Sequence, residues 1–371
     1  MRCYACGNRE AQMILDQPAA SIATNTPDDH NSSAGKFPCQ LFQCLACGHV
    51  YEKVTPELRS ALADIYTSCA AQLSVSMGEG NWGKERGEKI LKHFNRLVDI
   101  TAFQSALEIG CDKGYILRFL KSQGIQDVTG IEPSLKTAGI ADGINFVKAF
   151  ADRNLNLSRK FDFIYAFDVL DHVEDLEGFM DFIRRHLAPQ GQVFISVNNA
   201  DYYLETGSPA LFMHQHIQYF TDASLKLFFE RNGFVLKNLV KYQDEYHALA
   251  EFQGQSVNVA SKRDYSNYEN KLSLTLERIS ALLKIKHGAV HGASNTLKNI
   301  LEWCDINFDF MLVDNDTSKQ GQIYFGKKVL KSENVFSGNF EQIFIVPETF
   351  YPVIREDYLS RGFKGNIVGV R

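Results

Sequence analysis

Two short cysteine motifs of identical spacing constrain the N-terminal part of this chain more than any other feature. The motifs Cys3-Tyr4-Ala5-Cys6-Gly7 and Cys44-Leu45-Ala46-Cys47-Gly48 each place two residues between the cysteines and a glycine after the second. This spacing lets one tight turn direct both thiolates toward a single ion, and the glycine tolerates positive φ. Two such turns supply four soft ligands, which suit tetrahedral zinc. The predicted metal ligands are Cys3, Cys6, Cys44 and Cys47.

A site with four cysteine ligands has no open coordination position, so we expect the zinc to be structural rather than catalytic. Chance turns or disulfide bonds are the alternatives. The first residues lack the apolar run of a signal peptide, which predicts a cytoplasmic protein, and a reducing cytosol argues against disulfides. The polar segment 27–35, rich in turn formers, predicts a mobile loop between the motifs. Cys39 and His30 are possible substitute ligands, although neither has the local pattern.

The composition is that of a globular protein and excludes several classes of function. Of the 371 residues, 45% are hydrophobic and 22% are charged, which excludes a mostly disordered chain. At about 150 residues per domain, the length predicts two or three domains. A net charge of -5 provides no basic field that would attract nucleic acid. No run of 18 apolar residues is present, so neither a membrane span nor a membrane partner is expected.

The middle of the chain begins with a predicted strand, a glycine turn and a helix. Residues 105–109 are apolar enough for a strand, Gly110-Cys111-Asp112-Lys113-Gly114 follows, and helical spacing then resumes. A second predicted strand ends in Glu132, 22 residues after Gly110, where an acid is placed to accept hydrogen bonds from ribose hydroxyls. Two more strands and the helix between them are predicted at 161–167, 192–197 and 175–187. This alternation predicts an α/β fold with a doubly wound parallel sheet.

The acid before the glycine turn indicates which ligand the turn holds. Glu108 would repel a pyrophosphate but suits a cationic ligand, and S-adenosylmethionine carries an ammonium and a sulfonium and no phosphate. Together with Glu132 and the strand 161–167, the pattern resembles a class I methyltransferase. A generic Rossmann domain that binds another nucleotide cofactor is the alternative. The expected cofactor-binding residues are Glu108, Gly110, Asp112, Gly114, Glu132, Ala151, Asp152, Phe167 and Asp168.

The order of motifs along nearly the whole chain resembles the zinc-containing sugar C-methyltransferases, which act on nucleotide-linked deoxyketosugars. The core motif of that family is like residues 108–114, and its second motif is like Glu132-Pro133-Ser134. The segment Gln215-His216-Ile217-Gln218-Tyr219-Phe220-Thr221 is similar to the family's Glu-His-x-x-Tyr-Phe-Ser/Thr signature. The segment 64–68 resembles its tyrosine-bearing substrate lid. Further matches in the C-terminal part are the segments 291–297, 313–316 and 319–321.

This resemblance implies an architecture and an activity. It implies a zinc-binding module at 1–55, a class I methyltransferase core with a Rossmann-like fold at 56–260, and a second Rossmann-like domain at 261–371. The implied activity is C-methylation of a nucleotide-activated ketosugar, in the biosynthesis of a polysaccharide or a secondary metabolite. The implied cofactors are S-adenosyl-L-methionine and Zn²⁺. The implied partner is a small-molecule substrate, a nucleotide-linked sugar, rather than nucleic acid or a membrane.

Two departures from the family pattern fall in its substrate site. Gln215 stands where the family has a glutamate, and the segment 244–250 stands where it has Gly-Gly-Ser. The resemblance therefore supports the scaffold and the cofactor more directly than the methyl acceptor. An O-methyltransferase acting on a sugar or another polysaccharide precursor is one alternative. A non-catalytic scaffold of a zinc module and Rossmann domains is another.

Methylation on carbon requires a base, because the acceptor carbon must lose a proton beside a ketone to give an enolate. His216 is the first candidate base, since imidazole is the side chain that exchanges protons near neutral pH and the family uses its matching histidine close to the acceptor. His172, just past a strand end, and His214 compete for this role. Tyr219 is expected either to hydrogen-bond the substrate or to pack in the core. Tyr66 belongs to the segment that resembles the lid.

The C-terminal third is predicted to hold a second, smaller α/β unit. Residues 264–285 predict a long amphipathic connecting helix, and a strand, a turn and a helix follow from 289 onward. The turn at Gly292 precedes a helix, so its N–H groups are placed to hold an anion such as a sugar diphosphate. An inherited turn without a ligand is the alternative. Lys319 would add a positive charge to this turn, unless it is simply solvated.

Overall fold

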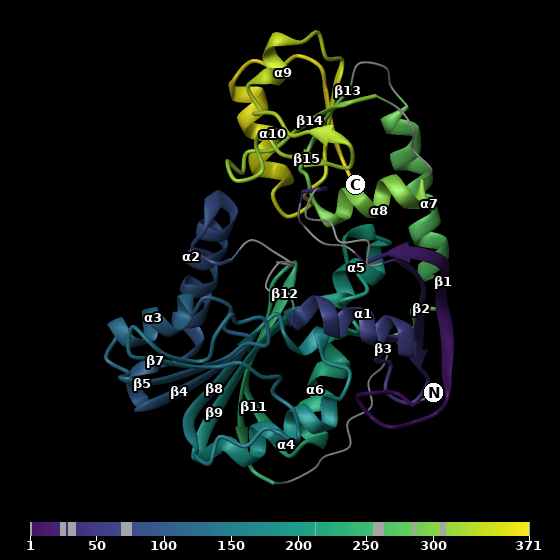
Figure 1. Ribbon diagram of the computed structural model, residues 1–371. Coiled ribbons are helices and arrows are strands. Elements are labelled where there is room, and N and C mark those ends of the chain that lie inside the picture. Colours follow the sequence, from purple (N-terminus) through teal and green to yellow (C-terminus); the bar gives the residue numbers. More distant parts are fainter. Residues whose placement is uncertain are drawn as a thin grey trace.

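The protein is described from a computed structural model, which covers residues 2–22, 27–28, 35–67, 76–211, 213–254, 263–284, 288–304 and 309–370. These residues form one eight-stranded sheet, two four-stranded sheets and a two-stranded hairpin. Figure 1 shows the large sheet in blue and teal, the N-terminal strands in purple beside it, and the C-terminal unit in yellow above both. The predicted loop residues 29–34, which include His30, lie outside the described residues.

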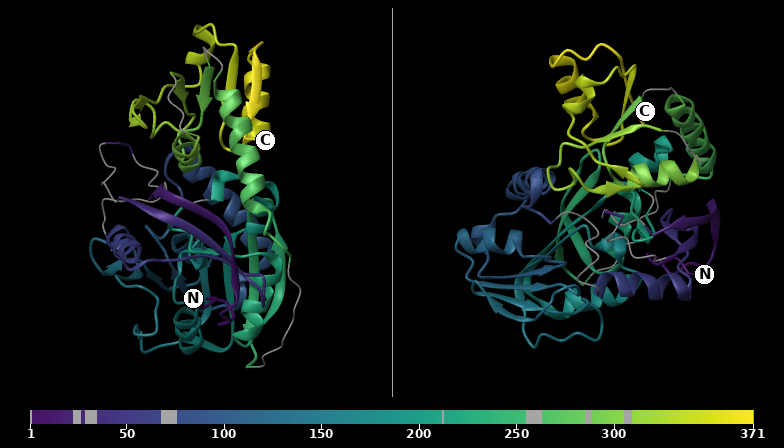
Figure 2. Two further views of the ribbon diagram at one scale, coloured as in Figure 1. Left: turned by 90° about the vertical axis from the view of Figure 1, so that its right-hand side faces the viewer. Right: turned by 45° about the horizontal axis from the view of Figure 1, so that its top comes forward.

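The N-terminal sheet is antiparallel and takes its last strand from far along the chain. Its order is β1 (Ala11–Ser21), β2 (Lys36–Cys44), β3 (Val50–Glu52) and β10 (Gln218–Tyr219). The apolar residues Ile14 and Leu41 of this sheet pack against two helices, α5 (Ala200–Thr206) and α7 (Tyr268–Leu283). The predicted zinc module is therefore completed by segments from beyond residue 200. Figure 2 shows the long green helix α7 running from the purple strands up to the C-terminal unit.

The eight-stranded sheet forms the centre of the molecule and has the strand order β11-β12-β9-β8-β4-β5-β7-β6. The strands are β4 (Ser105–Ile109), β5 (Asp127–Ile131), β6 (Gly139–Ala141), β7 (Ile144–Val147), β8 (Phe161–Phe167), β9 (Leu187–Asn198), β11 (Phe234–Lys241) and β12 (Glu245–Phe252). The prediction of a parallel sheet is correct for β4, β5, β7, β8 and β9. It is wrong for β6, β11 and β12, which are antiparallel to their neighbours. The three residues between β11 and β12 permit a hairpin but not a crossover.

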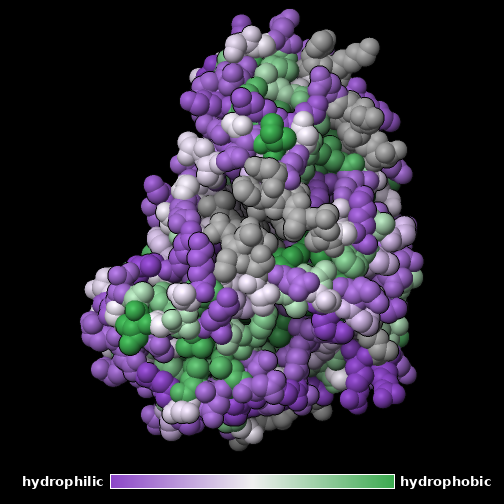
Figure 3. All heavy atoms as spheres, in the orientation of Figure 1, coloured by the Kyte–Doolittle hydropathy of each residue, from purple (hydrophilic) through white to green (hydrophobic). Residues whose placement is uncertain are grey.

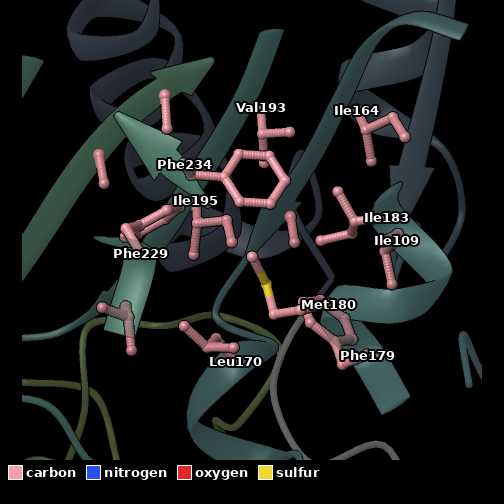
Figure 4. Packing of buried hydrophobic residues seen from close by; sticks show 14 of the residues in the cluster. Ile109, Ile164, Leu170, Phe179, Met180, Ile183, Val193, Ile195, Phe229 and Phe234 are labelled. Atoms are coloured by element: carbon pink, nitrogen blue, oxygen red, sulfur yellow. The ribbon is translucent and has the colours of Figure 1, made fainter. Parts of the chain in front are cut away.

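Helices cover both faces of this sheet and bury it in two apolar layers. The helices are α2 (Gly80–Leu97), α3 (Tyr115–Ser122), α4 (Leu176–His186) and α6 (Asp222–Arg231). Phe94 of α2 and Leu117 of α3 belong to one layer, and α4 and α6 contribute to the other. In Figure 4, Met180 and Ile183 of α4 lie against Val193 of β9 in that second layer. Because the helices cover the two faces, the loops that follow the parallel strands lie at the carboxyl edge of the sheet.

The remaining short elements connect these layers. They are α1 (Pro56–Thr67), η1 (Ile100–Ala102), η2 (Leu170–His172) and η3 (Pro209–Leu211). Helix α1 buries Leu58, Leu62 and Ile65 against Ile22 and Ile217. It thereby lies between the N-terminal strands and the core, as Figure 1 shows.

The C-terminal unit is a small parallel sheet of the predicted Rossmann-like kind. Its order is β14 (Met311–Val313), β13 (Gly288–His291), β17 (Gln342–Ile345) and β18 (Asn366–Gly369). Its other elements are α8 (Asn295–Trp303), β15 (Ile323–Tyr324), β16 (Lys327–Lys328), α9 (Asn334–Ser337) and α10 (Tyr351–Ser360). Helix α7 packs Leu272 on the N-terminal sheet and Leu283 on this unit. The domain limits 1–55, 56–260 and 261–371 stay a prediction, because β10 and α7 each connect two units.

The surface agrees with the globular composition. The face in Figure 3 is mostly hydrophilic, and apolar residues gather over its lower part, where the eight-stranded sheet and its helices lie. None of the helices in the part of the chain that the structure describes is both long and apolar enough to cross a membrane.

Candidate functional site

The four cysteines of the two motifs lie together. The Sγ atoms of Cys3 and Cys47 are 3.7 Å apart, those of Cys6 and Cys44 are 3.5 Å apart, and all four lie within 4.8 Å of one another. A tetrahedral zinc with bonds of 2.3 Å places its sulfurs about 3.8 Å apart, whereas a disulfide requires about 2.0 Å. The cluster therefore has the geometry of a four-sulfur metal site. Cys39 lies elsewhere, beside Glu52 and His214.

The glycine after each motif closes its turn. The N–H of Gly7 donates to the carbonyl of Cys3 at 2.8 Å, and the N–H of Gly48 donates to the carbonyl of Cys44 at 2.9 Å. Both glycines have a φ of 73°, a conformation that other residues rarely adopt. The two turns are thus local structures that follow directly from the motif.

The predicted cofactor loop leaves β4 as a tight turn against the segment that follows β8. Gly110 has a φ of 75°, and its N–H donates to the carbonyl of Ile131 at 2.8 Å. A Cβ at this position would lie 2.4 Å from Cγ2 of Val169. Gly114, with a φ of 77°, would bring a Cβ to 2.9 Å from the ring of Phe146. Both positions therefore require glycine.

We expect Gly110→Ala to weaken S-adenosylmethionine binding by at least about 10-fold, because the added Cβ must push Val169 away and deform the turn. The left-handed backbone adds strain of about 1–2 kcal/mol. Gly124→Ala is the matched control, since Gly124 has a φ of 106° but nothing within 4 Å of an added Cβ. Calorimetric titration with the cofactor measures the difference. Equal dissociation constants in the two variants would contradict a cofactor role for this loop.

Glu132 and Glu108 differ in what they offer to a ligand. Glu132 accepts hydrogen bonds from the N–H of Asp112 at 3.3 Å and from Oγ of Ser134 at 2.7 Å, so its carboxylate is fixed beside the loop. Glu108 is only 2% exposed and accepts from the hydroxyl of Tyr165 at 3.1 Å. Burial raises the pKa of Glu108 well above its usual range. The Glu108 carboxyl therefore lies in the core, and its contact with a cationic ligand stays a prediction.

The other predicted cofactor residues follow β7 or lie at the end of β8, and their side chains differ in burial and in hydrogen-bond partners. Phe167 is a correction, since its side chain is 4% exposed and packs in the apolar layer with Phe94. Asp168 has a φ of 50°, accepts from Oγ of Ser196 at 3.2 Å, and forms an ion pair with Arg86. Ala151 packs partly buried at the edge of the core. The Asp152 carboxylate accepts from the N–H groups of Asn154 and Leu155 at 2.8 and 3.1 Å.

Three of the predicted catalytic side chains, from distant parts of the chain, meet around Asp171. The hydroxyl of Tyr66, at the end of α1, lies 2.8 Å from Nδ1 of His172. The rings of His172 and His216 are edge to face with centroids 5.0 Å apart. Each ring places Nε2 3.7 Å from one carboxylate oxygen of Asp171. We call these four residues the Tyr66–His216 cluster.

The electrostatics of this cluster follow from burial around one carboxylate. The Asp171 side chain is 1% exposed and accepts a hydrogen bond from the side-chain amide of Asn198 at the end of β9. Burial lowers the pKa of His172 to about 4, despite the opposing charge of Asp171. Burial and the same charge raise the pKa of Tyr66 well above its usual range. At neutral pH, His172 is therefore neutral and Tyr66 keeps its proton.

Two predicted catalytic residues do not reach this cluster. Tyr219 is 1% exposed and packs among apolar residues that include Val50 and Leu204, so its core alternative is correct. His214 uses both ring nitrogens elsewhere, with Nδ1 2.6 Å from Oε1 of Glu52 and Nε2 3.0 Å from the carbonyl of Ala20. His214 is therefore not available as a base.

The structure adds two residues that the sequence did not indicate. Asp171 directly precedes His172 just past a strand end. This position is the only feature of the sequence that indicates a functional role for Asp171. Arg86 lies on α2, at a position that the helical pattern of apolar residues assigns to the solvent-facing side. Its side chain nevertheless forms an ion pair with Asp168. Burial lowers the pKa of Arg86, and the negative charges of Glu245 and Asp171 oppose this shift. The segment 244–250, which differs from the family pattern, contains Asp244 and Glu245. Their carboxylates form ion pairs with Nζ of Lys89 at 3.0 and 2.9 Å.

The turn at Gly292 already holds a carboxylate of the chain itself. The N–H of Ala293 donates to Oδ2 of Asp314 at 2.9 Å, and Nζ of Lys319 lies 3.3 Å from the same oxygen. Lys319 is 8% exposed, so it is not a solvated lysine. Asp314 thus occupies the Ala293 N–H, and binding of a sugar diphosphate at this turn stays a prediction.

Comparison with known proteins bears on the central part of the chain. Residues 82–239 match a family described as a methyltransferase domain, and this segment contains the glycine loop, Glu132 and both histidines of the cluster. This part of the core is therefore similar to a methyltransferase domain. Its sheet, parallel in the centre with the antiparallel pair β11 and β12 at one edge, is the class I methyltransferase form of the predicted Rossmann-like fold.

The relatives of this methyltransferase domain are distant. C-methyltransferase NovU of Streptomyces niveus is 23% identical over 251 residues, which cover 62% of this chain and 55% of that protein. The ubiquinone biosynthesis O-methyltransferase of Rickettsia typhi is 29% identical over 119 residues, covering 30% of this chain and 46% of that protein. A crystal structure of an S-adenosylmethionine-dependent methyltransferase from Mesorhizobium loti covers 44% of this chain and 98% of its own, with 17% identity and a TM-score of 0.39. The chain thus spans about half the length of the curated relatives it matches.

Proposed function

We propose that the protein transfers a methyl group from S-adenosylmethionine to a carbon atom of a nucleotide-linked ketosugar. The observation that carries this proposal is the Tyr66–His216 cluster, a group of proton-transfer side chains at the carboxyl edge of a methyltransferase sheet. The cluster adjoins the cofactor loop, since Val169 touches Gly110 and lies two residues before Asp171. The likeness to a protein named a C-methyltransferase adds support.

His216 acts as the base. It removes the proton from the acceptor carbon beside the ketone, and the electron pair of that C–H bond moves into the enolate. Asp171, 3.7 Å from Nε2 of His216, stabilises the imidazolium that forms. The carboxylate that Gln215 does not provide is thus supplied by Asp171. When bound, S-adenosylmethionine would supply an electrophilic methyl group, whose bond to sulfur would break as its bond to the acceptor carbon forms.

Tyr66 and His172 hold the oxygen of the acceptor ketone. With its proton on Nδ1, His172 donates to the Tyr66 hydroxyl, and the hydroxyl proton is then directed to the substrate oxygen. The raised pKa of Tyr66 keeps this proton in place while the enolate forms. A donor fixed where charge develops is the usual way in which enzymes stabilise such an anion.

The cofactor and the metal are assigned to residues that lie apart from the base. Gly110, Asp112 and Gly114 would hold the amino acid part of the cofactor, and Glu132 would accept hydrogen bonds from its ribose hydroxyls. Ala151, Asp152 and the backbone at Asp168 border the remainder. Because the four cysteines have zinc-like spacing, a structural Zn²⁺ bound by Cys3, Cys6, Cys44 and Cys47 completes the protein.

A hydroxyl acceptor is the second candidate. It is favoured by the 29% identity to a ubiquinone biosynthesis O-methyltransferase within the domain. A histidine base serves a hydroxyl as well as a carbon acid, and the position of the transferred methyl group distinguishes the two acceptors.

The test is incubation with S-adenosylmethionine labelled with ¹³C in its methyl group and a panel of nucleotide-linked ketosugars. We expect a new methyl resonance with the chemical shift and couplings of a methyl on carbon. A methyl on oxygen would establish the second candidate instead. Failure of calorimetry to detect any cofactor binding would contradict both and favour a non-catalytic scaffold.

A further inference from the structure

The residues on either side of His216 are fixed by the N-terminal sheet. On one side, Nδ1 of His214 lies 2.6 Å from Oε1 of Glu52. On the other side, the N–H of Glu52 donates to the carbonyl of Ile217 at 2.8 Å. A single residue of β3 thus contacts both chain positions that bracket the proposed base.

The same segment is fixed to the core from the opposite direction. The N–H of Ile217 donates to the carbonyl of Asp171 at 2.8 Å, and the side-chain amide of Gln218 donates to the carbonyl of Val173 at 2.9 Å. The short strand β10 then pairs with β3, where Gln218 lies opposite Tyr51. His216 is therefore held between the N-terminal sheet and the turn that carries Asp171.

Burial makes the Glu52 contact strong and costly to lose. Glu52 is 0% exposed and His214 is 2% exposed, so their mutual attraction is little screened by water. The second ring nitrogen of His214 is 3.0 Å from the carbonyl of Ala20, which fixes the orientation of the ring. Removing one partner of such a pair leaves a buried polar group without its main contact.

We infer that Glu52 is a positioning residue for His216, and that the N-terminal module thereby sets the geometry of the methyl-transfer site. Glu52 acts through His214 and Ile217 and does not touch the substrate. The inference rests on the proposed function of His216 as the base. It gives the N-terminal module a role in catalysis besides any role in stability.

The test compares Glu52→Ala with Glu52→Gln. Because a displacement of about 1 Å at a reacting group costs about 100-fold in rate, we expect Glu52→Ala to lower kcat by about 10- to 100-fold. The KM for S-adenosylmethionine and the zinc content should not change. Glu52→Gln keeps an oxygen that accepts from His214, so its kcat should remain within a few-fold of the wild-type value.

Cys39→Ala is the matched control, because the Cys39 thiol contacts Glu52 but bonds neither side of His216. It should leave kcat unchanged. Loss of kcat in Cys39→Ala equal to that in Glu52→Ala would overturn the inference, as would an equal loss in Glu52→Gln. Parallel losses of kcat, cofactor affinity and zinc would show a merely structural role and overturn it too.

Hydrogen exchange of the backbone amides at 214–219 gives a readout that does not need turnover. In folded Glu52→Ala we expect faster exchange at Ile217, whose N–H bonds Asp171, than in wild type or Cys39→Ala. Unchanged exchange at Ile217 would overturn the inference. Wild-type protein that methylates no ketosugar would instead contradict the proposed function, so the two failures are distinguishable.

Discussion

Replacing His216 with asparagine is expected to lower kcat by about 100- to 10,000-fold, the usual contribution of a general base. Asparagine retains much of the shape of the ring but cannot take a proton from the acceptor carbon. The cofactor loop and Glu132 do not depend on this side chain, so the dissociation constant for S-adenosylmethionine should stay within about 2-fold of the wild-type value. A large fall in kcat with unchanged cofactor affinity would show that the variant loses the chemical step rather than binding. Steady-state kinetics with the ketosugar and calorimetry with the cofactor measure the two quantities.

Exchange of the acceptor proton for deuterium isolates the step that His216 performs. With wild-type protein and S-adenosylhomocysteine in D₂O, the ketosugar should exchange this proton, and His216→Asn should abolish the exchange. His186→Asn is a control, because His186 bonds the carbonyl of Phe182 and the N–H of Leu157, away from the cluster. Full activity of His216→Asn together with loss of activity in His172→Asn would transfer the role of base to His172.

Replacing Cys44 with serine is expected to abolish the proposed zinc binding and to destabilise the N-terminal sheet by several kcal/mol. Structural zinc contributes about 10–16 kcal/mol of apparent binding free energy in small zinc-finger peptides, and serine is a far weaker ligand than a thiolate. Cys44 also ends β2, so the loss of metal should loosen the strand that pairs with β3. Metal analysis and thermal unfolding followed by circular dichroism give the two quantities.

The control for this change is Cys304→Ser. Cys304 is half-buried and its thiol donates to the carbonyl of Leu276 at 3.4 Å, far in sequence from the four-cysteine cluster. This variant should keep one zinc per chain and a melting temperature near the wild-type value. If a chelator removed the metal and abolished activity without lowering the melting temperature, the zinc would not be structural.

Several local elements followed from the sequence because their causes are local. The strand at 161–167 and the glycine turn after Ile109 depend on residue alternation and on backbone freedom within a few positions. The cysteine turns depend on a spacing of two residues and a glycine. For the same reason, His172 was found from its place just past a strand end, where parallel sheets carry their chemistry.

Other predictions failed where a partner distant in sequence decided the outcome. Phe167 and Tyr219 stand next to functional positions, but the packing of Phe94 and Leu204 draws their side chains into apolar layers. Glu108 accepts a hydrogen bond from Tyr165 on a neighbouring strand, a contact that the sequence did not indicate. Nothing within a few residues of these positions signals the direction in which each side chain points.

The amino-acid sequence determined the methyltransferase fold of the core and the pairing of four cysteines in two turns, since both depend on short-range spacing. Only the tertiary structure decided that Asp171 joins Tyr66 and His216, and that Glu52 holds the segment around the base. These contacts link residues 44 to 165 positions apart, and they exist only after the strands have paired and water has been excluded. Burial then gives a histidine, a tyrosine and a carboxylate properties that none of them has in the unfolded chain.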